Sequence, residues 1–368
     1  GGREGAQELR RFSPQGEEVS RLPHKIRVLI VDDSALVRKL LRDIIAADPE
    51  MEVAGTASNG VEAIRAVSEL EPDVVTMDIH MPEMDGLTAL EYIMRKHPLP
   101  VVMLSALVQK GATPTLKALE LGAVDFIAKP SHYPSAVKEV RDEVALKIKT
   151  AFQAMDRVRR GYRKAKAGKR LEVGKQIREG ERLVVIGASA GGPKALAEIM
   201  PMFPRETPAA IVIVQHMPGV FTRSFAGRLN SIASLPVKEA EEGEEIRAGT
   251  VLVAPGGSDL IVAVGDEGPA RVELMEPVNR GGATPRIDTT MVTAAEIYGP
   301  NAIGVIMTGM GSDGAKGMER IKKGKGSTIA QDEESCLVFG MPKVAIDKGC
   351  VDWVMPLEKI PAKILELL

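Results

Sequence analysis

The chain has 368 residues, with 48 lysines and arginines against 50 aspartates and glutamates and a formal net charge of −2. This near balance argues against binding to nucleic acid or anionic membranes through net positive charge. No run approaches the roughly 18 apolar residues of a membrane-spanning helix, and two cysteines exclude a disulfide framework or a cysteine-based metal cluster. At roughly 100–200 residues per domain, the length predicts two domains.

The first part of the chain predicts an α/β domain. Residues 1–24 are polar and charged, lack the apolar stretch of a signal peptide, and are expected to be a disordered extension of a cytoplasmic protein. Residues 25–133 alternate helical patterns with short β-branched runs, which are KIRVLIV, MEVAGTA, DVVTMDI, PVVMLSA and AVDFIAK. Five strands alternating with helices predict a doubly wound, five-stranded parallel sheet.

Residues 134–180 have the composition of a linker. The stretch SAVKEVRDEVALKIKTAFQAMDRVRR has helical apolar spacing and runs into the basic stretch GYRKAKAGKR. From Arg157 to Arg170 there are eight lysines or arginines and no acid. A solvated segment is one interpretation of this charge run, and a docking surface for an acidic partner is the other.

Residues 181–368 predict a second α/β domain. Its strand candidates are RLVVIGAS, AAIVIVQHM, TVLVAPG, LIVAV, ARVELME, AIGVIMTGM and STIAQD. The runs DLIVAV and ARVELME are separated by GDEGP, which predicts a hairpin. We therefore expect a mostly parallel sheet with one antiparallel hairpin.

Polar side chains stand where the strands of the first domain end. They are Asp32 and Asp33 after the first run, Asp78 after the third, Ser105 after the fourth and Lys129 after the fifth. The carboxyl ends of parallel strands meet at one edge of a sheet, where three carboxylates would repel each other without a cation such as Mg²⁺. A lysine and a hydroxyl beside them suit a phosphoryl group, with a carboxylate as nucleophile. Asp33 or Ser34 also suits the cap of the first helix.

The segments VLIVDDSALVRK, DVVTMDIHMPEMDG, VVMLSA and GAVDFIAKP resemble the receiver domain of two-component response regulators, which has a flavodoxin-like fold. The resemblance implies that Asp78 accepts a phosphoryl group from a histidine kinase in the presence of Mg²⁺. It further implies metal ligands at Asp32, Asp33 and Asp78, phosphoryl contacts at Ser105 and Lys129, and an aromatic switch residue at Phe126.

The stretch RLVVIGASAGGPKAL leads from a strand through a glycine loop into a helical pattern. A dinucleotide fingerprint would place a glycine where Ser189 stands and an acid at the end of the next strand, which instead ends in Gln215 and His216. No Walker motif is present either. The G-x-S-x-G spacing around Ser189 instead fits a nucleophile on a strand-to-helix turn, with a helix-capping serine as the alternative.

A nucleophilic serine needs a base and an acid that orients the base. His216 is the only histidine of residues 181–368 and follows the strand after Ser189. We favour Asp313 as the acid, because glycines around it permit close backbone approach. Asp332 is the runner-up, and Asp288 suits a structural role. The order serine, histidine, aspartate differs from that of α/β-hydrolases.

The segments IGASAGGPKAL, VIVQHMP, MTGMGSDGAKGM and IAQDEESCLVFGMPKVAIDKGCVD resemble the catalytic domain of the CheB family of chemotaxis protein-glutamate methylesterases. The resemblance implies a triad of Ser189, His216 and Asp313, with Met310 in the oxyanion-stabilising loop and no cofactor in this domain. Two departures are Ala190, where the family often has threonine, and TPRIDTTM, where it often has RPSVDVLF.

The resemblance implies a phosphorylation-activated serine hydrolase. It would demethylate glutamate methyl esters, and deamidate glutamines, on the cytoplasmic domains of methyl-accepting chemoreceptors, with the receiver inhibiting it until phosphorylated. We expect a histidine kinase and the receptors as partners, with no nucleic acid and no membrane insertion. The alternative is a non-enzymatic binding module switched by the receiver, whose basic linker touches RNA or a receptor tail. Residues 181–368 lack a basic helix with interleaved aromatics, which argues against nucleic acid.

Overall fold

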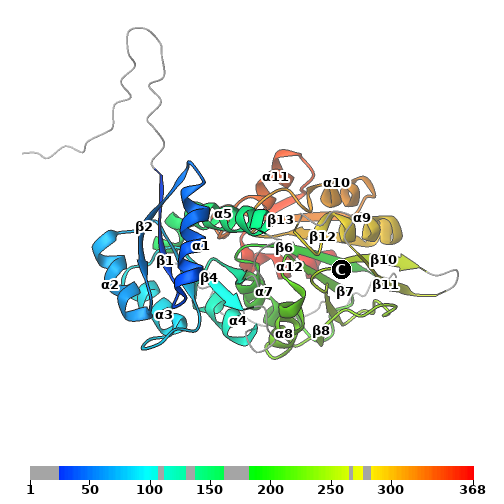
Figure 1. The fold of residues 1–368 in the computed structure, drawn as a ribbon. Helices are drawn as coiled ribbons and strands as arrows, with labels where there is room; N and C mark the ends of the chain where they lie inside the picture. The colour runs from blue at the N-terminus through cyan, green and yellow to red at the C-terminus, as the bar shows by residue number, and fades with distance from the viewer. Residues whose placement is uncertain (1–24, 107–111, 130–136, 161–181, 265–267, 277–282) are drawn as a thin grey trace, which may run out of the picture.

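The computed structural model describes residues 25–106, 112–129, 137–160, 182–264, 268–276 and 283–368, and its two large sheets lie in separate halves of the molecule (Figure 1). The extension expected at residues 1–24 and the basic stretch that begins at residue 161 lie outside the described residues. Across the described ranges, no helix is long and apolar enough to cross a membrane.

The first half contains the predicted five-stranded parallel sheet. Its strands are β1 (Ile26–Val31), β2 (Met51–Ala57), β3 (Val74–Asp78), β4 (Val101–Ala106) and β5 (Asp125–Lys129). They lie in the order β2-β1-β3-β4-β5, so the strand order reverses between β1 and β3. In such sheets functional sites form beyond the carboxyl ends of the strands at this reversal.

Helices cover both faces of this sheet. They are α1 (Ala35–Ala46), α2 (Gly60–Leu70), α3 (Gly86–Lys96), α4 (Ala112–Leu121) and α5 (Val137–Gln153). Side chains of Ser34, Asn59 and Asp85 accept hydrogen bonds from the first turns of α1, α2 and α3, which fixes where these helices begin. The helix predicted from residue 134 onward is present as α5 and the short α6 (Met155–Arg159), and α5 packs against the first sheet.

The second half contains a seven-stranded parallel sheet in the order β14-β13-β12-β6-β7-β9-β8. Its strands are β6 (Leu183–Ala188), β7 (Ala210–Gln215), β8 (Val237–Glu239), β9 (Val251–Val253), β12 (Ala302–Ile306), β13 (Ser327–Gln331) and β14 (Trp353–Met355). The predicted hairpin is the antiparallel pair β10 (Asp259–Val264) and β11 (Ala270–Met275). The α/β prediction is confirmed, although the three-residue edge strands β8 and β14 were not predicted.

Both faces of the second sheet are buried, as parallel sheets require. Val184 and Ile186 of β6 pack with α7 (Gly192–Ile199) and α8 (Gly219–Asn230), whereas Leu183 and Val185 pack with α9 (Ile287–Tyr298) and α10 (Ala315–Lys323). The remaining helices are α11 (Met341–Asp347), α12 (Ile360–Leu367) and the 3₁₀ turns η2 (Met200–Met202), η3 (Gly299–Asn301) and η4 (Leu357–Lys359). The order reverses between β6 and β12, which places a second candidate site there.

The two halves contact each other through α4, which packs against α7 and α8 (Figure 1). The rings of Phe126 and Phe221 meet edge to face, with centroids 4.7 Å apart. Glu120 and Arg228 form an ion pair across the same contact. Arg157 of α6 donates to the Leu337 carbonyl at 3.3 Å, so the helix after the first domain also touches the second.

Candidate functional site

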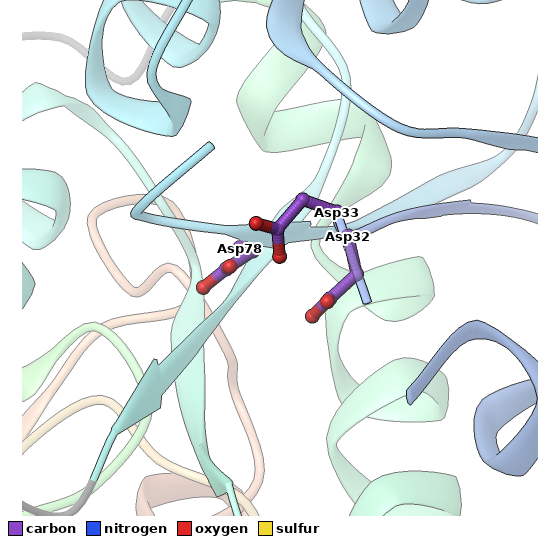
Figure 2. A group of neighbouring side chains, drawn as sticks. All are labelled: Asp32, Asp33 and Asp78. Atoms are coloured by element: carbon purple, nitrogen blue, oxygen red, sulfur yellow. The ribbon is translucent and has the colours of Figure 1, made fainter. Parts of the chain in front are cut away.

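Three carboxylates gather where β1 and β3 end (Figure 2). Asp32 and Asp33 follow β1, Asp78 ends β3, and each offers an oxygen within 4.8 Å of the others. The Lys129 ammonium, at the end of β5, lies 2.6 Å from Asp32 Oδ2 and 2.9 Å from Asp78 Oδ2. The structure thus brings the predicted acids and lysine together at one sheet edge.

Burial controls the charge state of this cluster. It raises the pKa of Asp78 above its usual value, and the hydrogen bond and charge of Lys129 offset only part of that rise. Burial lowers the pKa of Lys129, but its bonds to Asp32 and Asp78 raise it by more, so the ammonium form is favoured. The positive charge of Lys129 therefore lies beside three closely spaced carboxyl groups and offsets only part of their negative charge.

The donor set fits a magnesium ion, because three carboxylate oxygens offer the hard ligands this cation prefers.

The hydroxyl of Ser105 lies 2.6 Å from that of Thr115 in α4, so it links β4 to that helix. Phe126 is buried against Phe221 of the second half. The first helix is capped by Ser34, whose own amide donates to Asp32 Oδ1 at 2.9 Å.

Ser189 stands on the turn between β6 and α7. Its amide donates to the Thr308 carbonyl at 3.0 Å, which ties the turn to the segment after β12. Gly191 has a φ of 76°, a left-handed conformation that lets the chain enter α7. A Cβ on Gly309 would lie 2.7 Å from Ser189 Cβ, so only glycine allows the loop after β12 to approach the serine so closely.

His216 directly follows β7, whose Gln215 pairs with Ala188 of β6. The His216 amide donates to the Ala188 carbonyl at 3.1 Å, so the register of two neighbouring strands places the histidine beside the serine turn. Across the described ranges, no hydrogen bond joins the Ser189 hydroxyl to the His216 ring. Such bonds are often long before substrate binds.

Asp313 binds His216 through a hydrogen bond of 2.8 Å between Oδ2 and Nε2. Three backbone amides also donate to its carboxylate, from Ile287 at 2.8 Å, Asp288 at 2.9 Å and Gly314 at 3.0 Å. Burial raises the pKa of Asp313, but the bond and charge of His216 together with the amides lower it below the usual value. The carboxylate is therefore ionised at neutral pH and able to orient the imidazole.

The two other candidate acids point elsewhere. Asp332 Oδ1 accepts from the amide and the hydroxyl of Ser335, and so closes a local turn. Asp288 Oδ1 accepts from the Gly317 amide in α10 at 2.8 Å.

Met310 follows Gly309 beside Ser189, and its sulfur contacts the hydroxyl of Thr150 in α5.

Gln215 is a residue of this site that sequence reasoning passed over. It is 2% exposed, and its Nε2 donates to the carbonyls of Ser189 at 3.0 Å and His216 at 3.1 Å. One side chain thus joins the backbone of the predicted nucleophile to that of the predicted base. In the sequence it appears only as a glutamine that ends an apolar run directly before His216, and this position does not predict its hydrogen bonds.

Comparisons with known proteins show which proteins this chain resembles. The family model described as CheB methylesterase matches residues 184–364, and that of the response regulator receiver domain matches residues 28–141. A protein-glutamate methylesterase/protein-glutamine glutaminase of Pyrococcus abyssi is 49% identical over 93% of each chain. One of Thermotoga maritima is 46% identical over 93% of this chain and 98% of its own. The crystal structure of the Thermotoga maritima CheB methylesterase catalytic domain matches 51% of this chain and all of its own, with 46% identity and a TM-score of 0.50.

Proposed function

Because this chain belongs to the family of CheB methylesterases that carry a receiver domain, we propose that it is a phosphorylation-controlled serine hydrolase acting on glutamate methyl esters of chemoreceptors. The observation that carries the proposal is the convergence of Ser189, His216 and Asp313 at the carboxyl ends of β6, β7 and β12. The names of the relatives support deamidation of receptor glutamines as a second reaction.

The proposed reaction proceeds through an acyl-enzyme. The Ser189 hydroxyl attacks the ester carbonyl while His216 takes its proton, and Asp313 stabilises the imidazolium that forms. Backbone amides of the loop that carries Met310 would donate to the oxyanion, since this loop lies against Ser189. His216 gives the proton to the methoxy oxygen as its bond to carbon breaks, so that methanol leaves, and water then releases the free glutamate by the same steps with water as the nucleophile. In glutamine deamidation, ammonia leaves in place of methanol.

The receiver half would take a phosphoryl group on Asp78 from a histidine kinase. Asp32, Asp33 and Asp78 would hold Mg²⁺, which would neutralise the carboxylates and the charge of the transferring group. Lys129 would stay within reach of the new phosphoryl oxygens, because its ammonium already lies 2.9 Å from Asp78. The Ser105 hydroxyl would leave Thr115 and bind the phosphoryl group. The helix α4 would then lose this contact with β4 and be free to shift.

Phosphorylation would control the hydrolase through the contact between the two halves. The Glu120–Arg228 pair holds α4 against the catalytic half, the Phe126–Phe221 contact holds β5 against it, and Arg157 holds α6 against the Leu337 loop. We propose that the unphosphorylated receiver restricts substrate access in this way. An activation of about 100-fold needs a shift of only about 2.7 kcal/mol between closed and open forms.

The proposed domains are the receiver at residues 25–133, a linker at 134–180 and the catalytic domain at 181–368. The packing of α5 on the receiver sheet supports a linker whose first helix acts as part of the receiver. The substrates would be the cytoplasmic helices of methyl-accepting receptors, and the enzyme would therefore work in the cytoplasm.

The test is methanol release from a methylated receptor cytoplasmic fragment, with and without a small phosphodonor and Mg²⁺. Release that increases on phosphorylation is the expected result. No release in either state would contradict the hydrolase proposal and would favour a receiver-switched binding module, which co-sedimentation with the same fragment would then detect.

A further inference from the structure

Backbone amides at the start of each of the helices α9 and α10 donate to a carboxylate at the start of the other helix. Asp313 stands directly before the cap of α10, and its two oxygens accept from the amides of Ile287 and Asp288, the first two residues of α9. Asp288 in turn accepts from the Gly317 amide, in the first turn of α10, at 2.8 Å. Each carboxylate thus satisfies amides that an isolated helix would leave unpaired.

Tight packing fixes how these helix starts lie relative to the serine. A Cβ on Gly317 would lie 2.3 Å from Met291 Cβ, so the helices approach as closely as a glycine allows. Ile287 is fully buried, and its side chain fills the space beside Gly187 of β6 and Gly314 before α10. The start of α9 is therefore wedged between the strand that leads to Ser189 and the loop that carries Asp313.

We propose that Asp288 is a positioning residue of this hydrolase, which holds the first turn of α10 and thereby keeps the Asp313 carboxylate on His216. The inference rests on the proposed function, because it assigns Asp313 the role of orienting acid. Asp288 itself does not touch the reacting groups, since its Oδ1 faces the α10 amide. It acts through the backbone that carries Asp313.

The pKa shift of Asp288 is consistent with a carboxylate that accepts hydrogen bonds from backbone amides. Burial first, and then the nearby Asp313 charge, raise the pKa of Asp288, while amides of the α10 start lower it in part. Arg286 binds the fully buried Asp259 through its Nε at 2.6 Å. The Asp288 carboxylate therefore binds backbone amides at the start of α10, and its Oδ1 is the atom that accepts from Gly317.

Three variants of the full-length protein test the proposal. Asp288→Ala removes the acceptor, and we expect kcat to fall roughly 10- to 100-fold with KM nearly unchanged, because small misplacements of catalytic groups are costly. Asp288→Asn keeps an acceptor oxygen, and we expect its kcat within about threefold of the parent. The matched control is Asp352→Ala, which removes an acceptor for the Thr328 amide and hydroxyl at the amino ends of the strands. It also removes an ion pair with Lys322 in the last turn of α10, so it perturbs this helix at the end away from Asp313.

Two measurements separate positioning from mere stability. Thermal unfolding should show a lower Tm for both alanine variants, whereas kcat should fall only for Asp288→Ala. Proton NMR at low field should show the His216 ring proton bonded to Asp313 in the parent, Asp288→Asn and Asp352→Ala, and a weakened or absent signal in Asp288→Ala. A His216→Gln variant assigns this signal.

Asp288→Ala with normal kcat and an unchanged low-field proton would overturn the inference, even if its Tm falls. An Asp288→Asn variant as impaired as Asp288→Ala would overturn it as well, because the acceptor geometry would not be what matters. Asp313→Asn and Ser189→Ala separate this failure from that of the proposed function. If those two variants retain activity, the triad itself is wrong; if they lose it while Asp288→Ala does not, only the role of Asp288 falls.

Discussion

The receiver cluster and the catalytic cluster occupy equivalent places in two different sheets. Each lies beyond the carboxyl ends of parallel strands where the strand order reverses, between β1 and β3 or between β6 and β12. The receiver site sets three carboxylates against Lys129. The proposed catalytic site sets one carboxylate, Asp313, against the His216 ring and three backbone amides.

The difference appears in the opposite pKa shifts of Asp78, which is buried, and Asp313, which is half-buried. Burial leaves the pKa of Asp78 raised, because the charge of Lys129 is shared with Asp32. The same penalty at Asp313 is outweighed by its donors, so its pKa is lowered. A site with excess negative charge changes state when a cation and a phosphoryl group arrive, whereas a satisfied site is pre-organised for chemistry. The first arrangement suits a switch, and the second suits a catalyst.

The largest expected effect is that of Ser189→Ala. Removing the proposed nucleophile should lower methanol release on the order of 10³-fold or more, as in other serine hydrolases. Phosphorylation of the receiver should continue unchanged, since the two sites are separate. The control is Ser231→Ala at the exposed end of α8, where the hydroxyl donates to the Arg228 carbonyl at 2.7 Å and accepts from Arg228 Nη1 at 3.5 Å. Near-normal turnover in Ser189→Ala would show that the second site is not the catalyst and would break the comparison.

Asp78→Asn should separate the switch from the chemistry. The variant should keep the basal methanol release but lose the response to a phosphodonor, an effect of about 100-fold if the switch spans about 2.7 kcal/mol. Phosphoryl uptake and methanol release are measured on the same sample. Asp73→Asn is the control, because Asp73 accepts from the Arg27 amide at the opposite edge of the same sheet. A full response in Asp78→Asn would place the phosphoryl acceptor elsewhere.

Gln215→Ala tests whether the catalytic site depends on its pre-organisation. Without the amide that joins Ser189 to His216, we expect kcat to fall roughly 10-fold or more, because the two groups lose their fixed separation. The control is Thr328→Val, which removes a buried hydroxyl that donates to Asp352 at the amino edge of the sheet. Equal kcat losses in both folded variants would mean that general destabilisation, and not positioning, explains the effect.

The sequence predicted most where a pattern is local. Short apolar, β-branched runs predicted all five strands of the first sheet, five of the seven strands of the second, and the hairpin, because buried parallel strands are continuous apolar segments. The three-residue edge strands β8 and β14 were missed, whereas β9, also of three residues, was predicted because it lies in the longer apolar run TVLVAPG. The helix after residue 134 was predicted, but its contact with the Leu337 loop and with Met310 was not, since such contacts depend on tertiary packing.

The candidate sites show the same limit. Strand ends and glycine loops singled out Ser189, His216 and Asp313, and the structure joins the last two by a hydrogen bond. Gln215 and the exchange of carboxylates between α9 and α10 could not be predicted, because they depend on which side chain faces which backbone group after folding. The sequence predicts where groups gather at a sheet edge, and the structure adds the bonds that orient them.

The smallest expected effect concerns the contact that joins the two sites. Arg228→Glu places two carboxylates where Glu120 and Arg228 now pair, which should favour the open form and raise basal methanol release by up to about fivefold, since an exposed ion pair contributes at most about 1 kcal/mol. The phosphorylated activity should not change, because that form is already open. The double variant Glu120→Arg/Arg228→Glu should restore the low basal rate, although Lys117 near Glu120 opposes full recovery. Equal basal rates in the parent, the single variant and the double variant would mean that this pair does not couple the switch to the catalyst, and would leave the aromatic contact of Phe126 with Phe221 as the coupling to test.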